Sequence, residues 1–425
     1  MSDTTAAQLS LADLSLFPAT REQTIESRKR TLLQWGRGRS IKEYLHTEVI
    51  LETREPAIDG KFVVWVLAPR SDPTTIDFLC SCETFRRSAL VSRQSGGSSA
   101  PDVKEVTAYG VASVFTPAQK RGKGYARHMM RLLHWVLAPR SALSSTFPEE
   151  WGVPPDEKIL ESAGVGNAQF SVLYSDIGSD FYRSCGLDAT SRNGWYVTGA
   201  KETSWHMNPE ADLASHVHVE SEATESNVNL RRLTVDEVIK LYSHDANWIK
   251  DDLSRPPCAA SASDARQRRT RFTFLPNKGV GAFAIIRCMT LTPDLQPSLP
   301  SSQWASVIFP PSTSDLAHAL ATESVLPFIS WTFDSVRDAR IVVVTRLRAD
   351  EHTFPILLEE IKAVARQEKA AKIEFWYLQP ELRVIAEGKG WRTTGREEHL
   401  SAVKWYGDEE EDELDWVYNE KFCWC

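Results

Sequence analysis

The sequence predicts an α/β fold in which a mixed (α+β) sheet in an N-terminal domain is followed by a second, related half. Three observations lead to this prediction. Short apolar segments of strand character alternate with segments whose apolar residues have helical spacing. A glycine-bearing turn at residues 119–126 joins a predicted strand to a predicted helix. The order of strands and helices over residues 106–198 recurs over residues 341–405.

Two helices are expected first, because Thr20 with Gln23 and Ser40 with Glu43 have the form of capping boxes ahead of apolar residues at helical spacing. The other predicted elements of the first half are strands at 62–68, 76–90, 106–116 and 170–174 and helices at 124–138 and 179–185. The proline, serine and glycine residues of 139–168 predict a long surface loop there.

The second half is expected to begin after a polar, acidic stretch at residues 207–227. Its predicted helices are 233–250, 353–367 and 380–387, and its predicted strands are 272–274, 281–287, 341–346, 372–378 and 398–405. The predicted organisation is a first domain over 1–206, a linker over 207–227, a second domain over 228–406, and an acidic segment with a docked C-terminal tail over 407–425.

The composition narrows the classes of partner. The chain of 425 residues carries 49 Lys and Arg against 57 Asp and Glu, a net charge of -8, which argues against nucleic acid or an anionic membrane as partner. No run reaches the roughly 18 apolar residues that a membrane-spanning helix needs. Asp3 and Asp13 precede the first basic residue, Arg21, which fits neither a secretory signal nor a transit peptide. A cytoplasmic or nuclear location remains, and we expect the cytoplasm.

The cysteine pattern predicts reduced thiols and no metal site. There are seven Cys, an odd number spread over a long chain, which is typical of an intracellular protein without a disulfide framework. The two C-x-C pairs, at 80/82 and 423/425, lack a second pair at zinc-finger spacing, and the H-x-H pair at 216/218 stands in a polar stretch.

The turn at Gln119–Ala126 is the strongest chemical signal. Gly122 and Gly124 allow consecutive backbone N–H groups to point inward, and the N-terminus of the following helix adds its positive dipole end. Such a turn predicts a cradle for a diphosphate. Although the chain as a whole is negatively charged, the side chains around this turn are basic: Lys120, Arg121, Lys123 and Arg127.

These residues resemble the acetyl-CoA site of the GNAT superfamily of N-acetyltransferases, whose signature turn is Q/R-x-x-G-x-G/A. The segments 81–85, 110–115, 171–178 and 420–425 are, in addition, similar to those of the fungal lysine acetyltransferases that act on free L-lysine. The resemblance implies a GNAT-like N-terminal domain with a second, degenerate GNAT-like half, an acetyl-CoA co-substrate and direct acetyl transfer to a primary amine. It implies the ε-amine of free L-lysine as acceptor, and hence lysine catabolism.

The resemblance also implies roles for single residues. The backbone of Arg121–Ala126 would hold the diphosphate, and the end of the preceding strand would pair with the pantetheine arm. Tyr182 falls where the family places the general acid that returns a proton to the leaving thiolate. The implied cofactor site comprises Val114, Phe115, Thr116, Gln119, Lys120, Arg121, Gly122, Lys123, Gly124, Tyr125, Ala126 and Arg127.

The sequence indicates several candidates for the general base that removes a proton from the attacking amine. Glu83 is the first candidate, either as base or as counter-charge to a cationic substrate, because it stands in an otherwise apolar strand. A plain strand carboxylate is the alternative. Asp176 is the second candidate, and Tyr109 and His134 are further ones, although a histidine on a helix is more often a packed residue with satisfied hydrogen bonds.

The second half has no cradle, because residues 347–352 contain no glycine and include two acids that would repel phosphate. We therefore expect this half to be non-catalytic and to close the substrate side. The sequence leaves open whether the tail reaches the cleft, and what the oligomeric state is. It also leaves open a protein or polyamine acceptor, and a non-catalytic CoA-binding sensor or scaffold.

Overall fold

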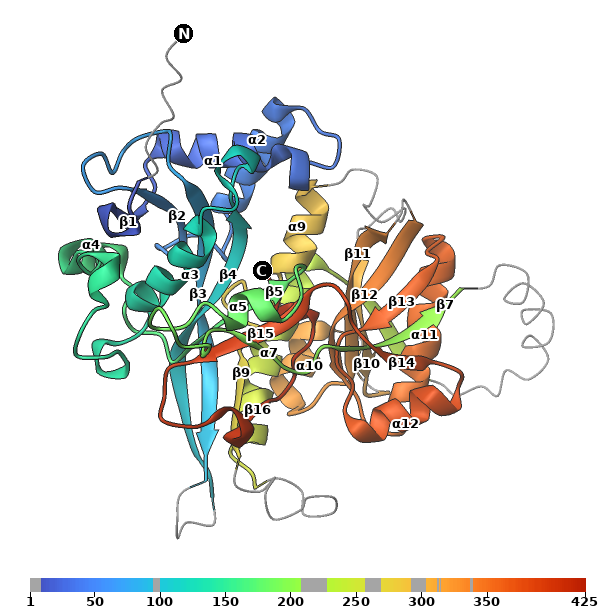
Figure 1. The fold of residues 1–425 in the computed structure, drawn as a ribbon. Coiled ribbons are helices and arrows are strands. Elements are labelled where there is room, and N and C mark those ends of the chain that lie inside the picture. The colour runs from blue at the N-terminus through green and yellow to red at the C-terminus, as the bar shows by residue number, and fades with distance from the viewer. Residues whose placement is uncertain are drawn as a thin grey trace.

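The chain forms two mixed β-sheets with helices packed around them, as seen in a computed structural model (Figure 1). The predicted α/β class is confirmed. The structure describes residues 9–94, 100–207, 228–256, 269–291, 303–311, 313, 315–336 and 339–425. Nearly all of the predicted linker at 207–227 lies outside these residues, as does the H-x-H pair. No helix within the described ranges is both long enough and apolar enough to cross a membrane.

The first sheet has the strand order β1-β2-β3-β4-β5-β15-β6, with β9 beside β3 and β16 beside β9. Neighbouring strands are antiparallel, except that β4 runs parallel to β5 and β9 to β16. The strands are β1 (Leu14–Pro18), β2 (Phe62–Pro69), β3 (Cys80–Arg93), β4 (Asp102–Phe115), β5 (Phe170–Ser175), β6 (Tyr196–Val197), β9 (Thr270–Phe274), β15 (Leu400–Trp405) and β16 (Leu414–Trp416).

The helices of the first half begin where the sequence signals place them. At the start of α1 (Arg21–Trp35), the Thr20 hydroxyl accepts from the Gln23 N–H at 3.2 Å and the Gln23 side chain accepts from the Thr20 N–H at 2.9 Å. Ser40 and Glu43 form the same reciprocal pair ahead of α2 (Ile41–Glu52). The glycine turn leads into α3 (Tyr125–Leu137), whose apolar face packs on the sheet.

Residues 139–168 hold more regular structure than the predicted loop. They contain α4 (Glu157–Ala163) and short 3-10 turns, because Asp156 caps the helix by accepting from the N–H groups of Lys158 and Ile159. Gly164 ends it in the left-handed conformation, a position that favours glycine. The helix predicted at 179–185 is the shorter α5 (Asp180–Arg183).

The second sheet has the order β14-β7-β13-β12-β11-β10-β8, and only β12 and β13 run parallel. Its strands are β7 (Lys201–His206), β8 (Asn229–Thr234), β10 (Gln303–Phe309), β11 (Phe328–Val336), β12 (Ala339–Arg348), β13 (Lys372–Phe375) and β14 (Arg392–Gly395). The helices of the second half are α7 (Val235–Leu253), α9 (Phe283–Leu291), α10 (Leu316–Thr322), α11 (Phe354–Gln367) and α12 (Pro380–Gly388).

The two sheets exchange strands between the halves of the chain. β7, which belongs to the predicted first domain, pairs with β13 and β14 in the second sheet. In return β15, from the predicted second domain, pairs with β5 and β6 in the first sheet, and β9 pairs with β3. The sheets therefore do not divide at the predicted domain boundaries, because each is completed by segments from the other half.

The strand predicted at 281–287 is wrong. Residues 283–291 form the helix α9, which packs against β11 and α2. A short run of buried apolar residues has no clear period, so it is compatible with a buried strand or with a buried helix. The Thr332 hydroxyl of β11 donates to the carbonyl of Ala284 at 3.2 Å and fixes the helix beside the strand.

A buried ionic cluster joins the C-terminal segment to the second sheet. Arg346, which is fully buried on β12, donates to Asp245 of α7 at 2.7 Å and to the carboxylate of Glu420. Glu420 also accepts from the N–H of Leu347 at 2.8 Å, and Arg348 donates to Asp245 at 2.8 Å. Each charge in this cluster faces an opposite charge, as burial requires.

We predict that Arg346→Met lowers the free energy of unfolding by about 3–5 kcal/mol, because it leaves buried carboxylates without their cation. Urea denaturation followed by circular dichroism measures the change. The matched control is Lys104→Met, which removes an exposed ion pair with Asp102 and should cost less than about 1 kcal/mol. Equal losses in the two variants would contradict the role given to the cluster.

Candidate active site

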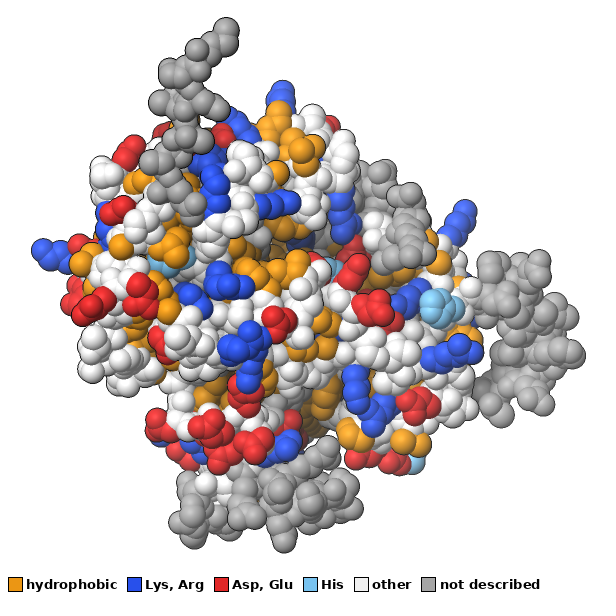
Figure 2. All heavy atoms as spheres, viewed as in Figure 1, with side chains coloured by type: hydrophobic (Ala, Val, Ile, Leu, Met, Phe, Trp, Pro, Cys, Tyr) orange, Lys and Arg blue, Asp and Glu red, His pale blue; other side chains and the backbone are white. Residues whose placement is uncertain are grey.

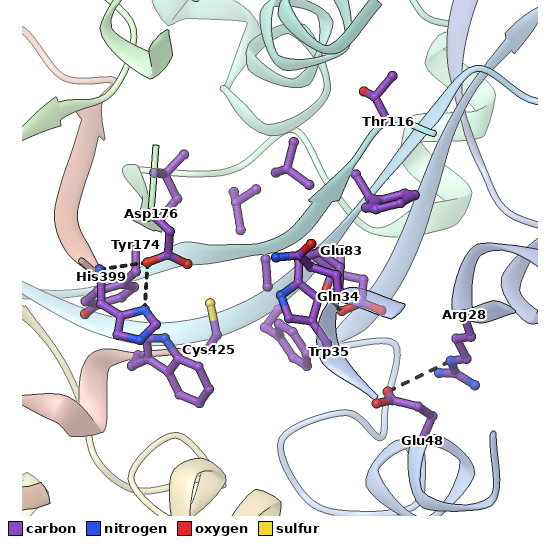
Figure 3. A pocket seen from close by; sticks show the side chains of 18 of the residues that line it. Arg28, Gln34, Trp35, Glu48, Glu83, Thr116, Tyr174, Asp176, His399 and Cys425 are labelled. Carbon is purple, nitrogen blue, oxygen red and sulfur yellow. Dashed lines mark hydrogen bonds and ion pairs between the residues drawn. The ribbon is translucent and has the colours of Figure 1, made fainter. Parts of the chain in front are cut away.

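A cavity of about 1040 Å³ is lined by residues from both halves of the chain (Figure 3). The first half contributes residues of α1, α2, β3 and β4, the glycine turn and α5. The second half contributes Phe283, Ile286 and Arg287 of α9, Asp334 of β11 and His399. The cavity thus lies where the exchanged elements bring the two halves together.

One wall of the cavity forms where β4 and β5 part. Their parallel register ends at Gly110 with Val172, whereas the strands continue to Phe115 and Ser175. Beyond that point β4 still pairs with β3, but its edge toward β5 has no partner among the described strands, and residues 111–115 line the cavity. A backbone edge of this kind offers hydrogen-bonding groups to an extended ligand.

A bulge in β4 reshapes the same edge. The register with β3 shifts between Ser81 and Glu83, and Ser113 adopts a left-handed φ of 52°. A bulge leaves one residue out of the ladder and turns the neighbouring groups toward a new direction, which is common beside active sites. The Ser113 hydroxyl here donates to Glu83 at 2.6 Å.

The glycine turn has the conformation that an anion cradle requires. Gly122 and Gly124 have φ values of 76° and 82°, in the region that favours glycine. A Cβ at either position would meet no atom within 4 Å, so the space above the turn is open. Gly124 is the N-cap of α3, which places the helix N-terminus at the same opening.

The residues predicted to hold the cofactor lie along this turn and the parted edge, with two exceptions. Val114, Phe115, Thr116, Lys120, Arg121, Gly122, Gly124, Tyr125, Ala126 and Arg127 line the cavity, whereas Gln119 and Lys123 do not. The Lys120 ammonium is already held by the Asp77 carboxylate at 2.5 Å. Arg121 donates from Nε to the carbonyl of Thr116 at 2.9 Å, which leaves its two terminal nitrogens for an anion.

Glu83, the first candidate base, lines the cavity. Figure 3 draws it between the pair Asp176–His399 and the pair Arg28–Glu48. Burial and the neighbouring Glu48 raise the pKa of Glu83 above its ordinary value, although the hydrogen bond from Ser113 acts in the opposite direction. A carboxylate with a raised pKa accepts a proton more readily near neutral pH than an ordinary one.

Asp176, the second candidate, also lines the cavity but is already engaged. It accepts from the N–H of His399 at 2.8 Å and faces the Nδ1 of the same residue at 3.0 Å. Burial raises the pKa of Asp176, but the hydrogen bonds and charge of His399 outweigh burial, and the pKa lies below its ordinary value. This carboxylate is therefore suited to hold a positive charge rather than to take up a proton.

Tyr182 of α5 lines the cavity and is only 9% exposed. Burial raises its pKa, so the hydroxyl keeps its proton at neutral pH. Tyr109 and His134 do not line the cavity. Tyr109 donates to Asn167 at 2.8 Å, and His134 bonds to Tyr406 and to the carbonyl of Cys185, so both are packed residues with satisfied hydrogen bonds.

Sequence reasoning missed the cavity residues that come from α1, α2 and the second half. Arg28 is buried and pairs with Glu52 at 2.5 Å, with Glu48 close by (Figure 3). Arg37 at the end of α1 pairs with Asp334 at 2.7 Å. The capping boxes place α1 and α2 but do not indicate which of their charged residues face a cavity.

The acidic segment and the residues after it are bound to the rest of the molecule. Figure 2 shows acidic side chains gathered on this face in the region of β16. Glu409 pairs with Arg93 at 2.5 Å, and Glu411 pairs with Arg183. Trp424 and Cys425 line the cavity.

Glycine at position 110 lets the last residues approach the sheet. A Cβ at Gly110 would lie 2.6 Å from Sγ of Cys425, beside the point where β4 and β5 part. Arg87 donates to the carbonyls of Cys423 and Trp424 at 2.7 and 3.1 Å and holds this segment in place.

In the second half, the turn that corresponds to the glycine turn lies between β12 and α11, and the Asp350 side chain occupies it. Between β12 and α11 the Asp350 carboxylate accepts from the N–H groups of His352 and Thr353 at 3.0 and 2.7 Å. These amides are thus satisfied by the Asp350 side chain, and the absence of a cradle in this half stays a prediction. No group of three or more His, Cys, Asp or Glu side chains in the described part of the chain is placed to hold a metal ion.

Comparisons with known proteins identify relatives of this chain. Residues 215–425 match the family model of the LYC1 GNAT-like C-terminal domain. The chain is 29% identical over 170 residues to a lysine acetyltransferase of Yarrowia lipolytica, a match that covers 39% of this chain and only 38% of that protein.

Two solved structures resemble the fold at low sequence identity. A GCN5-related N-acetyltransferase from Anabaena variabilis superposes with a TM-score of 0.49 at 11% identity, over 93% of this chain and 73% of that chain. A GCN5-related N-acetyltransferase from Kribbella flavida gives a TM-score of 0.47 at 13% identity, over 93% and 72% of the two chains.

We predict that His399→Asn raises the pKa of Asp176 toward its ordinary value, because the substitution removes the imidazole while asparagine tolerates the left-handed φ of 49° at this position. Carbon-13 NMR of labelled aspartate carboxyls measures the change. Asp188, which is held by Thr190 and Ser191, serves as the control and should not move. An unchanged Asp176 would show that His399 does not set its pKa.

Proposed function

We propose that this protein, whose residues 215–425 match the family model of the LYC1 GNAT-like C-terminal domain, is an acetyl-CoA-dependent N-acetyltransferase that acts on the ε-amine of free L-lysine. One observation carries the proposal. A single cavity joins the glycine turn and the open edge of β4 to Glu83 and Tyr182, so a site for a diphosphate-bearing thioester and groups for proton transfer share one space.

The residues of the cavity fit acetyl-CoA. The open space above Gly122 and Gly124 and the N-terminus of α3 suit a diphosphate, with Arg121 and Arg127 beside it. The backbone edge of β4 after Gly110 suits the amides of the pantetheine arm. When bound, acetyl-CoA supplies an acetyl group activated as a thioester.

Glu83 and Tyr182 each take part in one of the two proton transfers. Direct attack forms a C–N bond to the acceptor amine and breaks the C–S bond, so the amine must lose a proton and the sulfur must gain one. Glu83, with its raised pKa, is placed to take up the proton of the amine. Tyr182, which keeps its proton at neutral pH, is placed to donate to the sulfur.

The charge of the cavity supports a small cationic acceptor. Five carboxylates line it together with seven Lys and Arg side chains, and among the described residues Glu83 forms no ion pair, so this carboxylate can face a protonated amine. The relative from Yarrowia lipolytica is named a lysine acetyltransferase. The carboxylates of the cavity and the name of this relative support free L-lysine as the acceptor. A role in lysine breakdown is part of the same proposal.

The experiment that tests the function is an acceptor assay with the purified full chain. Acetyl transfer from acetyl-CoA is measured with free L-lysine, a lysine-containing peptide and spermidine, at equal amine concentrations. We expect the highest kcat/KM for free L-lysine. Binding of acetyl-CoA without turnover on any amine would favour a sensor, and a preference for peptide or spermidine would overturn the acceptor.

We predict that Gly122→Glu weakens acetyl-CoA binding by about 100-fold or more, because it adds negative charge and a strained backbone at the cradle. Isothermal titration calorimetry measures the change. Gly166→Glu is the matched control, since Gly166 has a φ of 85° and equally open surroundings but does not line the cavity. Normal binding by the Gly122 variant would refute the assignment of the cradle.

We predict that Tyr182→Phe lowers kcat by about 100-fold while acetyl-CoA binding is preserved, because the loss of a general acid costs roughly 10²–10⁴ in rate. Steady-state kinetics and calorimetry on the same preparation separate the two effects. Tyr109→Phe, on a tyrosine outside the cavity, is the control. If kcat survives the change at 182, the proton comes from another group.

A further inference from the structure

The second half places two opposite charges on the wall of the cavity. Arg287 comes from α9 and Asp334 from β11, and both line the cavity. The helix and the strand are joined by the hydrogen bond from Thr332 to Ala284. Neither residue belongs to the glycine turn or is itself a proton-transfer group, although the charge of Arg287 acts to lower the pKa of Glu83.

Arg287 is half-buried and has no carboxylate paired with it among the described residues. The other arginines near this wall differ, since Arg28 pairs with Glu52 and Arg37 with Asp334. The Arg287 guanidinium lies over the ring of Trp424 at 5.6 Å, a cation–π contact that does not use its N–H donors. An unpaired, partly buried guanidinium of this kind suits a carboxylate that arrives with a ligand.

Asp334 keeps one carboxylate oxygen for a further donor. Both of its hydrogen bonds among the described residues, from Arg37 at 2.7 Å and from the N–H of Ser335 at 2.9 Å, end on Oδ1. Burial raises the pKa of Asp334, but Lys421 and Arg37 outweigh burial, and the pKa lies below its ordinary value. Asp334 is therefore ionised at neutral pH, and Oδ2 can accept from an ammonium group.

An α-amino acid carries a carboxylate and an ammonium on one carbon, which matches this pair of charges. We propose that Arg287 binds the α-carboxylate and Asp334 the α-ammonium of the acceptor, so that its side-chain amine reaches toward Glu83. The assignment rests on the proposed function and gives its acceptor as a free amino acid. It also excludes competitors, because a polyamine would place a cation opposite Arg287 and a peptide lacks both free groups.

The test uses acceptors that each lack one of the two groups. Cadaverine is L-lysine without the α-carboxylate, and 6-aminohexanoate is L-lysine without the α-ammonium. Arg287→Gln should lower the ratio of kcat/KM for L-lysine to that for cadaverine by about tenfold or more, since a hydrogen-bonded charge is lost for one acceptor alone. Asp334→Asn should lower the ratio of L-lysine to 6-aminohexanoate by a similar factor.

Controls separate the failure of this inference from other failures. Arg392→Gln, on an exposed arginine of β14 outside the cavity, should leave both ratios as in the wild type. Arg287→Lys keeps the charge without the planar fork, so its ratio should fall between those of wild type and Arg287→Gln. Calorimetry with acetyl-CoA confirms that each variant is folded.

The outcomes are distinct. If the wild type acetylates L-lysine but both ratios stay unchanged in the variants, the roles of Arg287 and Asp334 are overturned while the proposed function stands. If the wild type acetylates no amine, the proposed function itself fails. The assignment is supported if Arg287→Gln lowers only the ratio of L-lysine to cadaverine and Asp334→Asn lowers only the ratio of L-lysine to 6-aminohexanoate.

Discussion

The exchange of strands between the two sheets is the constraint on which the rest of the structure depends. β15 completes the first sheet beside β5, and β7 completes the second beside β13, so neither sheet is finished by its own half of the chain. β15 follows directly after His399 and therefore brings that residue to Asp176. The halves cannot separate without breaking both sheets, so the cavity between them is a fixed part of the fold.

The same constraint explains the buried charges. Because the C-terminal segment must lie across both halves, Glu420 reaches Arg346 of β12, while Arg87 of β3 holds the carbonyls of Cys423 and Trp424. Charges held in this way are costly to bury without partners and so specify one arrangement of the segment. The same arrangement brings the ring of Trp424 to the Arg287 guanidinium, 5.6 Å away.

The sequence predicted those features that depend on neighbouring residues. The capping boxes at Thr20 and Ser40 and the glycine turn involve groups within a few positions, so their residue types suffice to place them. The strand exchange depends on distant partners, such as His206 with Lys372, and nothing in Lys201–His206 indicates which sheet this strand will join. Arg287 and Asp334 were not predicted as cavity residues for the same reason. In addition, the residues of α9 up to Arg287 were predicted to form a strand.

The two equivalent turns differ in what occupies their backbone amides. Both turns present backbone amides after a strand that runs parallel to its neighbour. In the first half, glycines leave the amides open to a ligand. In the second, the Asp350 carboxylate accepts from the amides itself and also from the Thr353 hydroxyl at 2.7 Å. A phosphate at this turn would have to displace the Asp350 carboxylate and would meet its negative charge. In the proposed function the second half contributes to the cavity through α9 and β11 instead, which carry Arg287 and Asp334.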